Sequence, residues 1–176
     1  LTLYANYSYT LTEYGEEYLI ANIDDPSVPS QIWGTFTQVD EVSNVAVGAD
    51  ADLFTYNLKG NALKGIPEQK YTINATYEAD TRVGPLWYNI SYSYTGDFSA
   101  SGIERAYDNV PSRNVTNISV SWFSEDGDIS IRAYIDNVMD NKDYYSITTS
   151  EITRDYQKYA WPLAERSYGI DMRYNF

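Results

Sequence analysis

Acidic clusters are the first groups in this sequence whose types and spacing could do chemistry. Residues 125–128 read EDGD, which resembles a calcium-binding loop in composition. No further ligand sequence follows, and the Asp-Gly pair supplies the positive φ that a tight turn requires, so we predict a hairpin turn here. We interpret two further acidic groups as solvated loop residues. They are Asp24 with Asp25 and Asp50 with Asp52.

The residue types on which most catalytic and metal sites depend are missing. The 176 residues include no Cys and no His. Without Cys there is no disulfide, thiolate metal site or thiol nucleophile, and without His the usual general base and metal-binding imidazole are absent. We therefore expect a protein that is not an enzyme and that carries no resident metal or cofactor.

Aromatic residues in the polar segments are the candidate ligand contacts. Rings in such segments suit planar or amphipathic ligands. The same rings could equally belong to a girdle at a membrane interface, so both interpretations stay open. The candidates are Trp33, Phe36, Phe54, Tyr56, Tyr159 and Trp161.

The net charge limits the possible partners. The chain carries 25 acidic and 12 basic residues, a formal net charge of -13. It lacks the basic footprint of a nucleic-acid or anionic-lipid binder, and we expect no nucleic-acid partner. No apolar run reaches the length of a membrane-spanning helix. The chain starts at Leu1 without a charged or apolar secretory leader, so we expect the natural start of the polypeptide to lie upstream.

Six segments alternate apolar and polar residues with a period of two, which predicts β-strands. In the last of them one face carries Tyr168, Ile170, Met172, Tyr174 and Phe176. The other face carries small and charged residues, including Asp171 and Arg173. Alternation alone does not say whether the apolar face meets a protein core or lipid. The six segments are 1–11, 71–77, 86–95, 115–122, 129–135 and 165–176.

The connections between these strands alternate in length. Residues 78–85 and 124–128 are short and contain Gly, Pro or Asp-Gly, as tight turns need. Residues 12–69, 96–114 and 144–165 are long and polar. Short turns at one end and long loops at the other are typical of an outer-membrane barrel. Asn, Ser and Thr recur on the polar faces, where we interpret them as hydrogen-bonding groups of a polar lumen rather than glycosylation sites.

Three stretches resemble the C-terminal barrel strands of TonB-dependent outer-membrane receptors, and together they span about two thirds of the chain. The first, residues 58–78, contains Gly60, Asn61 and Pro67 before a strand. The second, residues 129–145, resembles the penultimate strand and ends in Asn137, Val138, Asp140, Asn141 and Tyr144 or Tyr145. The third, residues 164–176, resembles the terminal strand, with Arg166, Tyr168, Gly169, Arg173, Tyr174 and Phe176 at the matching positions.

This resemblance implies an all-β fold, in which residues 1–176 are the last six strands of an antiparallel, up-and-down transmembrane barrel of roughly 22 strands. The earlier barrel strands and the N-terminal plug domain would be absent from this chain. Six strands are too few to close, because bacterial barrels start at about eight, and an open sheet edge cannot face lipid. We therefore expect a fragment of a longer receptor.

The resemblance also implies a place and a role. The receptor would lie in the bacterial outer membrane and import a scarce nutrient such as a ferric siderophore, without covalent chemistry. Its partners would be outer-membrane lipid, the plug and the missing barrel strands, the TonB energising complex acting through the plug, the barrel-assembly machinery, and a small-molecule substrate such as a metal chelate.

Two groups of residues receive roles from the same resemblance. Arg132, Asp171 and Arg173 would face the lumen, in ion pairs or against the plug. The alternating residues of the last strand would form the signal that the barrel-assembly machinery reads. These are Tyr168, Ile170, Met172, Tyr174 and Phe176.

Two other architectures stay open at this point. In the first, the chain is a small self-contained outer-membrane barrel of about eight strands, with an extra hairpin between residues 33 and 47. That stretch barely holds two strands of membrane length. In the second, the chain is a soluble β-sandwich binding module whose tyrosine-rich faces pack on one another. Haem, siderophore, cobalamin and glycan are all possible ligands of the receptor.

Overall fold

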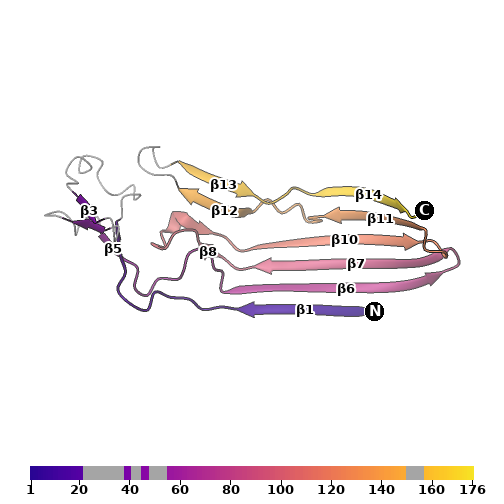
Figure 1. Ribbon diagram of the computed structural model, residues 1–176, viewed down its shortest axis with the longest axis horizontal. Coiled ribbons are helices and arrows are strands. Elements are labelled where there is room, and N and C mark those ends of the chain that lie inside the picture. Colours follow the sequence, from indigo (N-terminus) through magenta and orange to yellow (C-terminus); the bar gives the residue numbers. More distant parts are fainter. Residues whose placement is uncertain (22–37, 41–44, 48–54, 150–156) are drawn as a thin grey trace.

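One long antiparallel sheet dominates the computed structural model, which describes residues 1–21, 38–40, 45–47, 55–149 and 157–176. Each strand of this sheet pairs with the next one along the sheet in chain order, and β1 and β14 form its two edges (Figure 1). The described fold is therefore an all-β, up-and-down meander that does not close. The strands are β1 (Thr2–Tyr9), β6 (Gln69–Thr81), β7 (Gly84–Thr95), β10 (Arg113–Phe123), β11 (Ile129–Asp136) and β14 (Ser167–Tyr174).

All six strands that alternation predicts are present, but the first short connection is shorter than the sequence predicts. Residues 78–85 were expected to form a turn, and most of them are strand: only Arg82 and Val83 separate β6 from β7. The chain can reverse so tightly because Gly84 has a φ of 113° and the Thr81 hydroxyl donates to the Gly84 carbonyl. Strand pairing then continues to the last possible residue.

The second short connection is the hairpin turn that its composition predicts. Gly127 has a φ of 79°, and its amide donates to the Ser124 carbonyl at 3.0 Å. The Asp126 carboxylate accepts hydrogen bonds from the Ser124 hydroxyl and the Asp128 amide, and these bonds lower the pKa of Asp126 below its ordinary value. The carboxylate thus stabilises its own turn. Among the described residues, no group of three or more acidic side chains is arranged to hold a metal ion.

The strand register brings the apolar sets of all six strands onto one face of the sheet. One row of apolar residues across the middle of the sheet shows this, because each residue in the row is the register partner of the residue on the neighbouring strand. The row is Leu3, Ala75, Ile90, Ile118, Ile135 and Tyr168. A slip of one residue in any pair would move that strand's apolar set to the opposite face, so the register and the alternation agree throughout.

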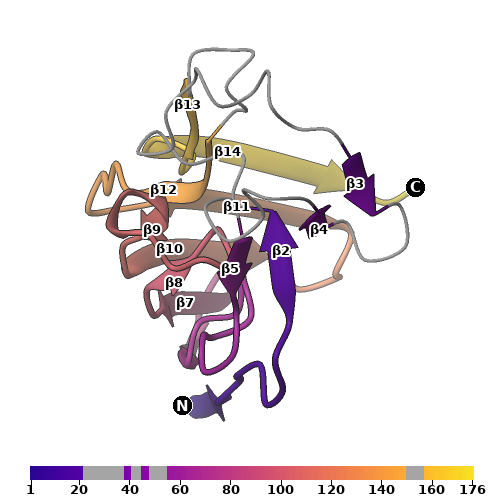
Figure 2. The same cartoon turned by 90° about the vertical axis from the view of Figure 1, so that its left-hand side faces the viewer.

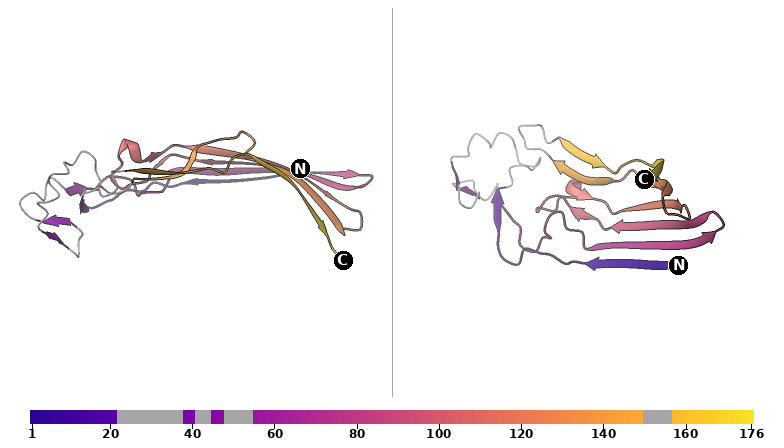
Figure 3. Two further views of the ribbon diagram at one scale, coloured as in Figure 1. Left: turned by 90° about the horizontal axis from the view of Figure 1, so that it is seen from above. Right: turned by 45° about the vertical axis from the view of Figure 1, so that its right-hand side comes forward.

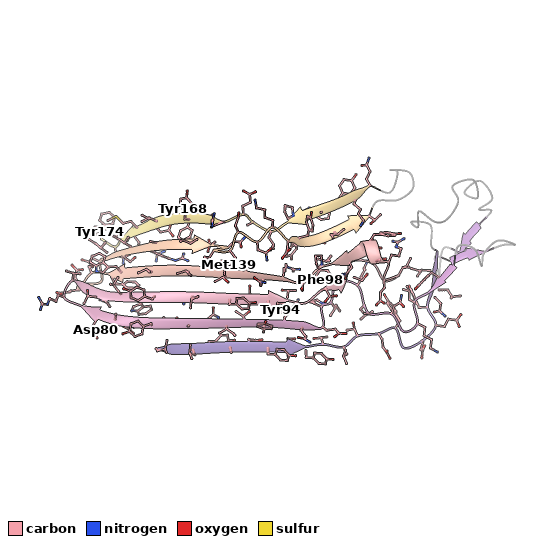
Figure 4. All side chains as sticks on the ribbon, turned by 180° about the vertical axis from the view of Figure 1, so that it is seen from behind. Asp80, Tyr94, Phe98, Met139, Tyr168 and Tyr174 are labelled. Atoms are coloured by element: carbon pink, nitrogen blue, oxygen red, sulfur yellow. The ribbon has the colours of Figure 1, made fainter. Side chains whose placement is uncertain are left out.

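No described element covers this apolar face. Viewed from its edge, the sheet is a single curved layer (Figure 3), and in the view of its back no described element lies across the long strands (Figure 4). Ile118 in the middle of the sheet is 38% exposed, and Ile170 on β14 is 76% exposed. The buried large apolar residues among those described are Leu58, Ile103 and Val110, and none lies in the six-stranded sheet. The arrangement does not fit the β-sandwich alternative, which requires a second packed layer.

Short strands gather at one end of the sheet, and the two tight turns lie at the other (Figures 1 and 2). These short strands pair with one another in two-stranded sheets and do not join the six-stranded sheet. The pairs are β2 (Leu19–Ala21) with β5 (Thr55–Asn57), β3 (Gln38–Asp40) with β4 (Val45–Val47), β8 (Phe98–Ser99) with β9 (Asn109–Val110), and β12 (Tyr144–Thr149) with β13 (Lys158–Pro162). The 3-10 turn η2 (Ala106–Asp108) precedes β9.

The self-contained barrel of about eight strands finds no support in these short elements. It needs two further strands of membrane length between residues 33 and 47, about ten residues each. The described parts of that stretch are β3 and β4, three residues each, which pair only with one another within the described residues. Residues 33–37 and 41–44 lie outside the described residues.

The described residues contain no helix that is both long and apolar enough to cross a membrane.

Replacing Gly84 by Ala is expected to destabilise the sheet. A Cβ atom at this position would lie 2.0 Å from the Phe123 carbonyl oxygen, and the φ of 113° disfavours any L side chain. We expect the free energy of unfolding to fall by at least about 2 kcal/mol. Urea unfolding of the protein in detergent micelles measures this.

The matched control is Gly15→Ala, because a Cβ atom at Gly15 meets nothing within 4 Å. Its unfolding free energy should change by no more than about 0.5 kcal/mol. Equal effects of the two substitutions would contradict the close approach of β7 to β10.

Candidate functional site

The apolar face carries aromatic rings toward both ends of its strands. Near the loops, the Tyr71 and Tyr94 rings stack with their centroids 4.9 Å apart, and Tyr92 lies 6.0 Å from Tyr71. Near the turns, Tyr77 lies 6.3 Å from Tyr88. Tyr71 and Tyr77 are roughly 20 Å apart along β6, at about 3.4 Å per residue. Aliphatic side chains between two aromatic rows form the pattern of a face that meets lipid.

The opposite face is lined mainly by small polar side chains, with a few charged and aromatic ones. The Asn89 amide donates to the Thr76 hydroxyl at 2.8 Å. Arg132 and Asp171 are register partners, and their side chains form an ion pair at 3.8 Å. Both side chains are at least half exposed, so this pair contributes little to stability. Arg173 lies on the same face of β14, opposite Ser130, and its predicted role in the lumen is not tested by this geometry.

A cavity of about 390 Å³ lies beside these charges. Its two guanidinium groups and two hydroxyl groups give it more hydrogen-bond donors than acceptors. It is lined by Ser121, Phe123, Ser130, Ile131, Arg132, Asp171, Met172 and Arg173.

Gly169 has a physical role on the same face. It pairs with Tyr134 of β11, and a Cβ atom at Gly169 would lie 2.6 Å from the Tyr134 hydroxyl oxygen. The ring therefore lies across the glycine, and the Arg132 guanidinium sits 5.0 Å from the ring centroid. An aromatic ring over a strand glycine pins the register, so this contact holds β14 against β11.

The residues of the predicted assembly signal lie where alternation places them. Four of them are exposed on the apolar face of β14, and Phe176 follows the strand with its ring edge-on to Tyr174 at 4.9 Å. The outer edge of β14 pairs with no described strand. Recognition by the assembly machinery stays a prediction. The four are Tyr168, Ile170, Met172 and Tyr174.

Asn137 holds together the chain where it leaves β11 and returns toward β14. It is 3% exposed and has a φ of 50°, which Asn tolerates better than most residues. Its side-chain amide donates to the backbone carbonyls of Asn141 and Ala164, both at 2.9 Å, and its side-chain oxygen accepts from the Asn141 backbone amide. Its own backbone amide donates to the Asn117 side chain on β10. One buried side chain therefore joins the two ends of the loop between β11 and β14, residues 137–166. We call the place where these two ends meet the neck of the loop.

Asn141 extends this neck to β10. Its side-chain amide donates to the Asn114 carbonyl at 3.0 Å, and its side-chain oxygen accepts from the Asp143 amide at 3.1 Å. The second stretch of the receptor resemblance thus has a structural explanation, because its two Asn residues satisfy backbone groups that the irregular chain leaves unpaired.

The loop between β1 and β6 packs on the loop between β7 and β10. The Asn61 amide donates to the Gly102 carbonyl at 2.8 Å, and the Gly65 amide donates to the Ser99 carbonyl at 2.8 Å. Leu58 is 3% exposed and lies against Gly102. Gly60 has a φ of 87°, which lets the chain turn between Leu58 and Asn61. Residues 58–78, the first stretch that resembles the receptors, therefore include the contact between these two loops.

The structure separates the predicted ligand contacts. Tyr159 and Trp161 lie together on β13, where they are 42% and 51% exposed. Tyr56 lies on β5 in a different sheet, half-buried beside Asn61. The other three predicted residues, Trp33, Phe36 and Phe54, lie outside the described residues.

Sequence reasoning missed a buried charged group among the loops. Asp108 is 2% exposed and pairs with Arg105 at 2.7 Å. It borders a cavity of about 310 Å³ where three loops meet, lined in part by Ile20, Lys64 and Thr149. Nothing in the sequence SGIERAYDNV distinguishes this carboxylate from solvated ones, because its partner Thr149 comes from a distant loop.

Comparisons with known proteins agree with this fold. No family model and no curated protein matches the chain. It is similar to the ferric yersiniabactin uptake receptor FyuA from Yersinia pestis, with a TM-score of 0.60 and 19% sequence identity over 68% of this chain and 18% of that one. It is also similar to BauA, the ferric preacinetobactin receptor from Acinetobacter baumannii, with a TM-score of 0.55 and 16% identity over 68% and 16% of the two chains. The likeness shows the fold alone, and this chain spans less than a fifth of either receptor.

Replacing Asn137 by Ala is expected to open the neck of the loop 137–166. The change leaves the Asn141 amide and the Ala164 carbonyl without their buried partner, so the free energy of unfolding should fall by about 2–4 kcal/mol. Urea unfolding in detergent measures this, and limited proteolysis reports the local opening.

Asn6→Ala is the control, because Asn6 is exposed on β1. It should change stability by no more than about 0.5 kcal/mol. An Asn137→Ala protein as stable and as resistant to protease as the Asn6→Ala protein would refute the role of this side chain.

Proposed function

We propose that residues 1–176 are the C-terminal segment of the barrel of a TonB-dependent outer-membrane receptor, which imports a scarce nutrient such as a ferric siderophore. The observation that carries the proposal is the uncovered apolar face of the sheet. Six strands direct their apolar sets to one side, and no described element packs there. Burying a Leu or Ile side chain contributes about 1.5–3 kcal/mol, so such a face needs an apolar environment, which a lipid bilayer supplies.

Two features support a larger barrel around this segment. The outer edges of β1 and β14 pair with no described strand, and an unpaired backbone group in lipid costs several kcal/mol. Further strands must therefore cover both edges in a membrane. The two similar receptors are several times longer than this chain, which leaves room for further strands, and we propose a barrel of roughly 22.

The proposed mechanism is binding and transport without covalent chemistry. The loops at one end of the sheet capture the substrate on the outside, and the TonB complex then acts through a plug domain to open a path along the polar face. Tyr56, Tyr159 and Trp161, together with Trp33, Phe36 and Phe54, are the proposed substrate contacts. A ferric chelate is the favoured substrate because both similar structures are named as receptors for one.

Uptake by the full-length protein tests this function. The gene is deleted in its bacterium, and growth and uptake of radioactive iron are measured with ferric yersiniabactin, ferric preacinetobactin and haemin, with cobalamin as a separate substrate. We expect uptake of one iron source to be lost on deletion, restored by the gene and abolished without TonB. Fractionation should recover the protein with the outer membrane. A soluble protein, or uptake that is unchanged by the deletion, would contradict the proposal.

A charge on the apolar face should cost far more than the same charge on the polar face. Ile90 and Ser91 are neighbours in β7 that point to opposite sides of the sheet. Ile90→Lys should lower the free energy of unfolding in lipid vesicles by about 2–4 kcal/mol, because Lys would lie in the hydrocarbon layer. Ser91→Lys is the matched control, expected to cost less than about 1 kcal/mol. Equal costs would show that the apolar face does not meet lipid.

A further inference from the structure

The hairpin formed by β12 and β13, which we call the aromatic arm, has two different faces. Tyr159 and Trp161 are two residues apart on β13 and therefore share one face. Their register partners on β12, Thr148 and Ser146, lie on the same face. Both rings are substantially exposed. The residue pair Thr149 and Lys158 lies on the other face. One face of the arm therefore presents two rings, and the other is free to contact the rest of the protein.

The second face is held by the 3-10 turn η2 in the loop between β7 and β10. The Thr149 hydroxyl donates to the Asp108 carboxylate at 2.9 Å. The Lys158 ammonium donates to the Tyr107 carbonyl and lies 5.2 Å from the centroid of the Tyr107 ring. Both strands of the arm thus bond to the turn η2. The strand β9 directly follows η2 in the chain, and β12 runs beside β9 (Figure 2).

Asp108 is the centre of this contact. One carboxylate oxygen accepts from the Arg105 side chain at 2.7 Å and the other accepts from Thr149. Its backbone is tied to its own loop, because its amide donates to the Arg105 carbonyl and its carbonyl accepts from the Ala100 amide. A buried carboxylate requires such partners, since an unpaired one is strongly destabilising. The carboxylate is therefore fixed on its own loop, and its hydrogen bond from Thr149 holds the arm.

The root of the arm is fixed separately. Arg113 of β10 lies between two rings, with its guanidinium 5.7 Å from the Phe98 centroid and 5.4 Å from that of Tyr145 at the start of β12. Asn137 closes the neck below it. Release of Asp108 leaves the Lys158 contact with Tyr107 as the other described tie to this turn, so the upper part of the arm should loosen while its root stays in place.

We propose that Asp108 is a positioning residue for substrate capture, which fixes the aromatic arm so that Tyr159 and Trp161 present a preformed surface. The proposal rests on the proposed function of the loops. A preformed surface binds more tightly because less conformational freedom is lost on binding. Asp108 acts only through the arm, and its own carboxylate oxygens are both engaged in the structure.

The first measurement is the position of the arm, which needs no substrate. The chain contains no Cys, so Ser112→Cys and Thr148→Cys can carry spin labels, one on the connection before β10 and one in the upper part of β12 beside Thr149. In the full-length protein, the distance between the labels should have a narrow distribution. Asp108→Ala and Thr149→Val should broaden it, whereas Thr149→Ser keeps the hydroxyl and should leave it narrow. Identical distributions in all variants would overturn the proposal.

The second measurement is binding of ferric yersiniabactin, ferric preacinetobactin and haemin to the same variants. For the probe that the wild type binds, Asp108→Ala and Thr149→Val should raise the Kd about tenfold, and Thr149→Ser should restore wild-type affinity. A loosened arm with unchanged Kd would overturn the role in capture. A wild type that binds none of the probes would contradict the proposed function, while broadening in Thr149→Val would still support Asp108 as the group that holds the arm.

Discussion

The register of the six-stranded sheet is the constraint on which the rest of the structure depends. Side chains alternate along a strand, so each strand could present its apolar set to either side, and a shift of one residue in any of five pairings would mix the two faces. The observed pairings put every apolar set on the same side. The result is a sheet with an apolar face and a polar face, and no described element packs a core against either. Its stability therefore depends on the surroundings of the apolar face, and in the membrane setting that we propose, its open edges would require further strands.

The two ends of the sheet obtain order by different physical means. At one end the chain reverses through short turns, two residues between β6 and β7 and five between β10 and β11, with Gly84 and Gly127 at positive φ. At the other end long segments have little apolar surface to bury, and three large apolar side chains are buried among those described. Their order comes from polar groups instead. Asn137 and Asp108 are both at least 97% buried: Asn137 satisfies backbone groups at the two ends of its own loop, and Asp108 accepts a hydrogen bond from Thr149 of a separate loop. This is how loops without a hydrophobic core can hold exposed rings in place.

The strands and turns could be predicted because their signals are local. Alternation in the last segment identifies β14, and the Asp-Gly pair identifies the turn before β11. The first turn was predicted too wide because Gly and Pro at its end, read as turn residues, lie within β7. The candidate site was harder to predict from the sequence. The pair of Tyr159 and Trp161 follows from their spacing on one strand, but the contact between Asp108 and Thr149 joins residues about forty positions apart in polar segments. No local pattern marks such a contact.

The sequence by itself determined the period-two pattern, the alternation of short and long connections, and the absence of thiol and imidazole chemistry, because these are properties of residue type and near neighbours. Only the tertiary structure decided that the six apolar sets coincide on one face, that this face has no described partner layer, and that Gly169 accommodates the Tyr134 ring. It also decided that Asp108 is the buried one among the described acidic residues. The physical reason is the same in each case: register, burial and cross-loop hydrogen bonds depend on residues that are distant in the chain and close only after folding.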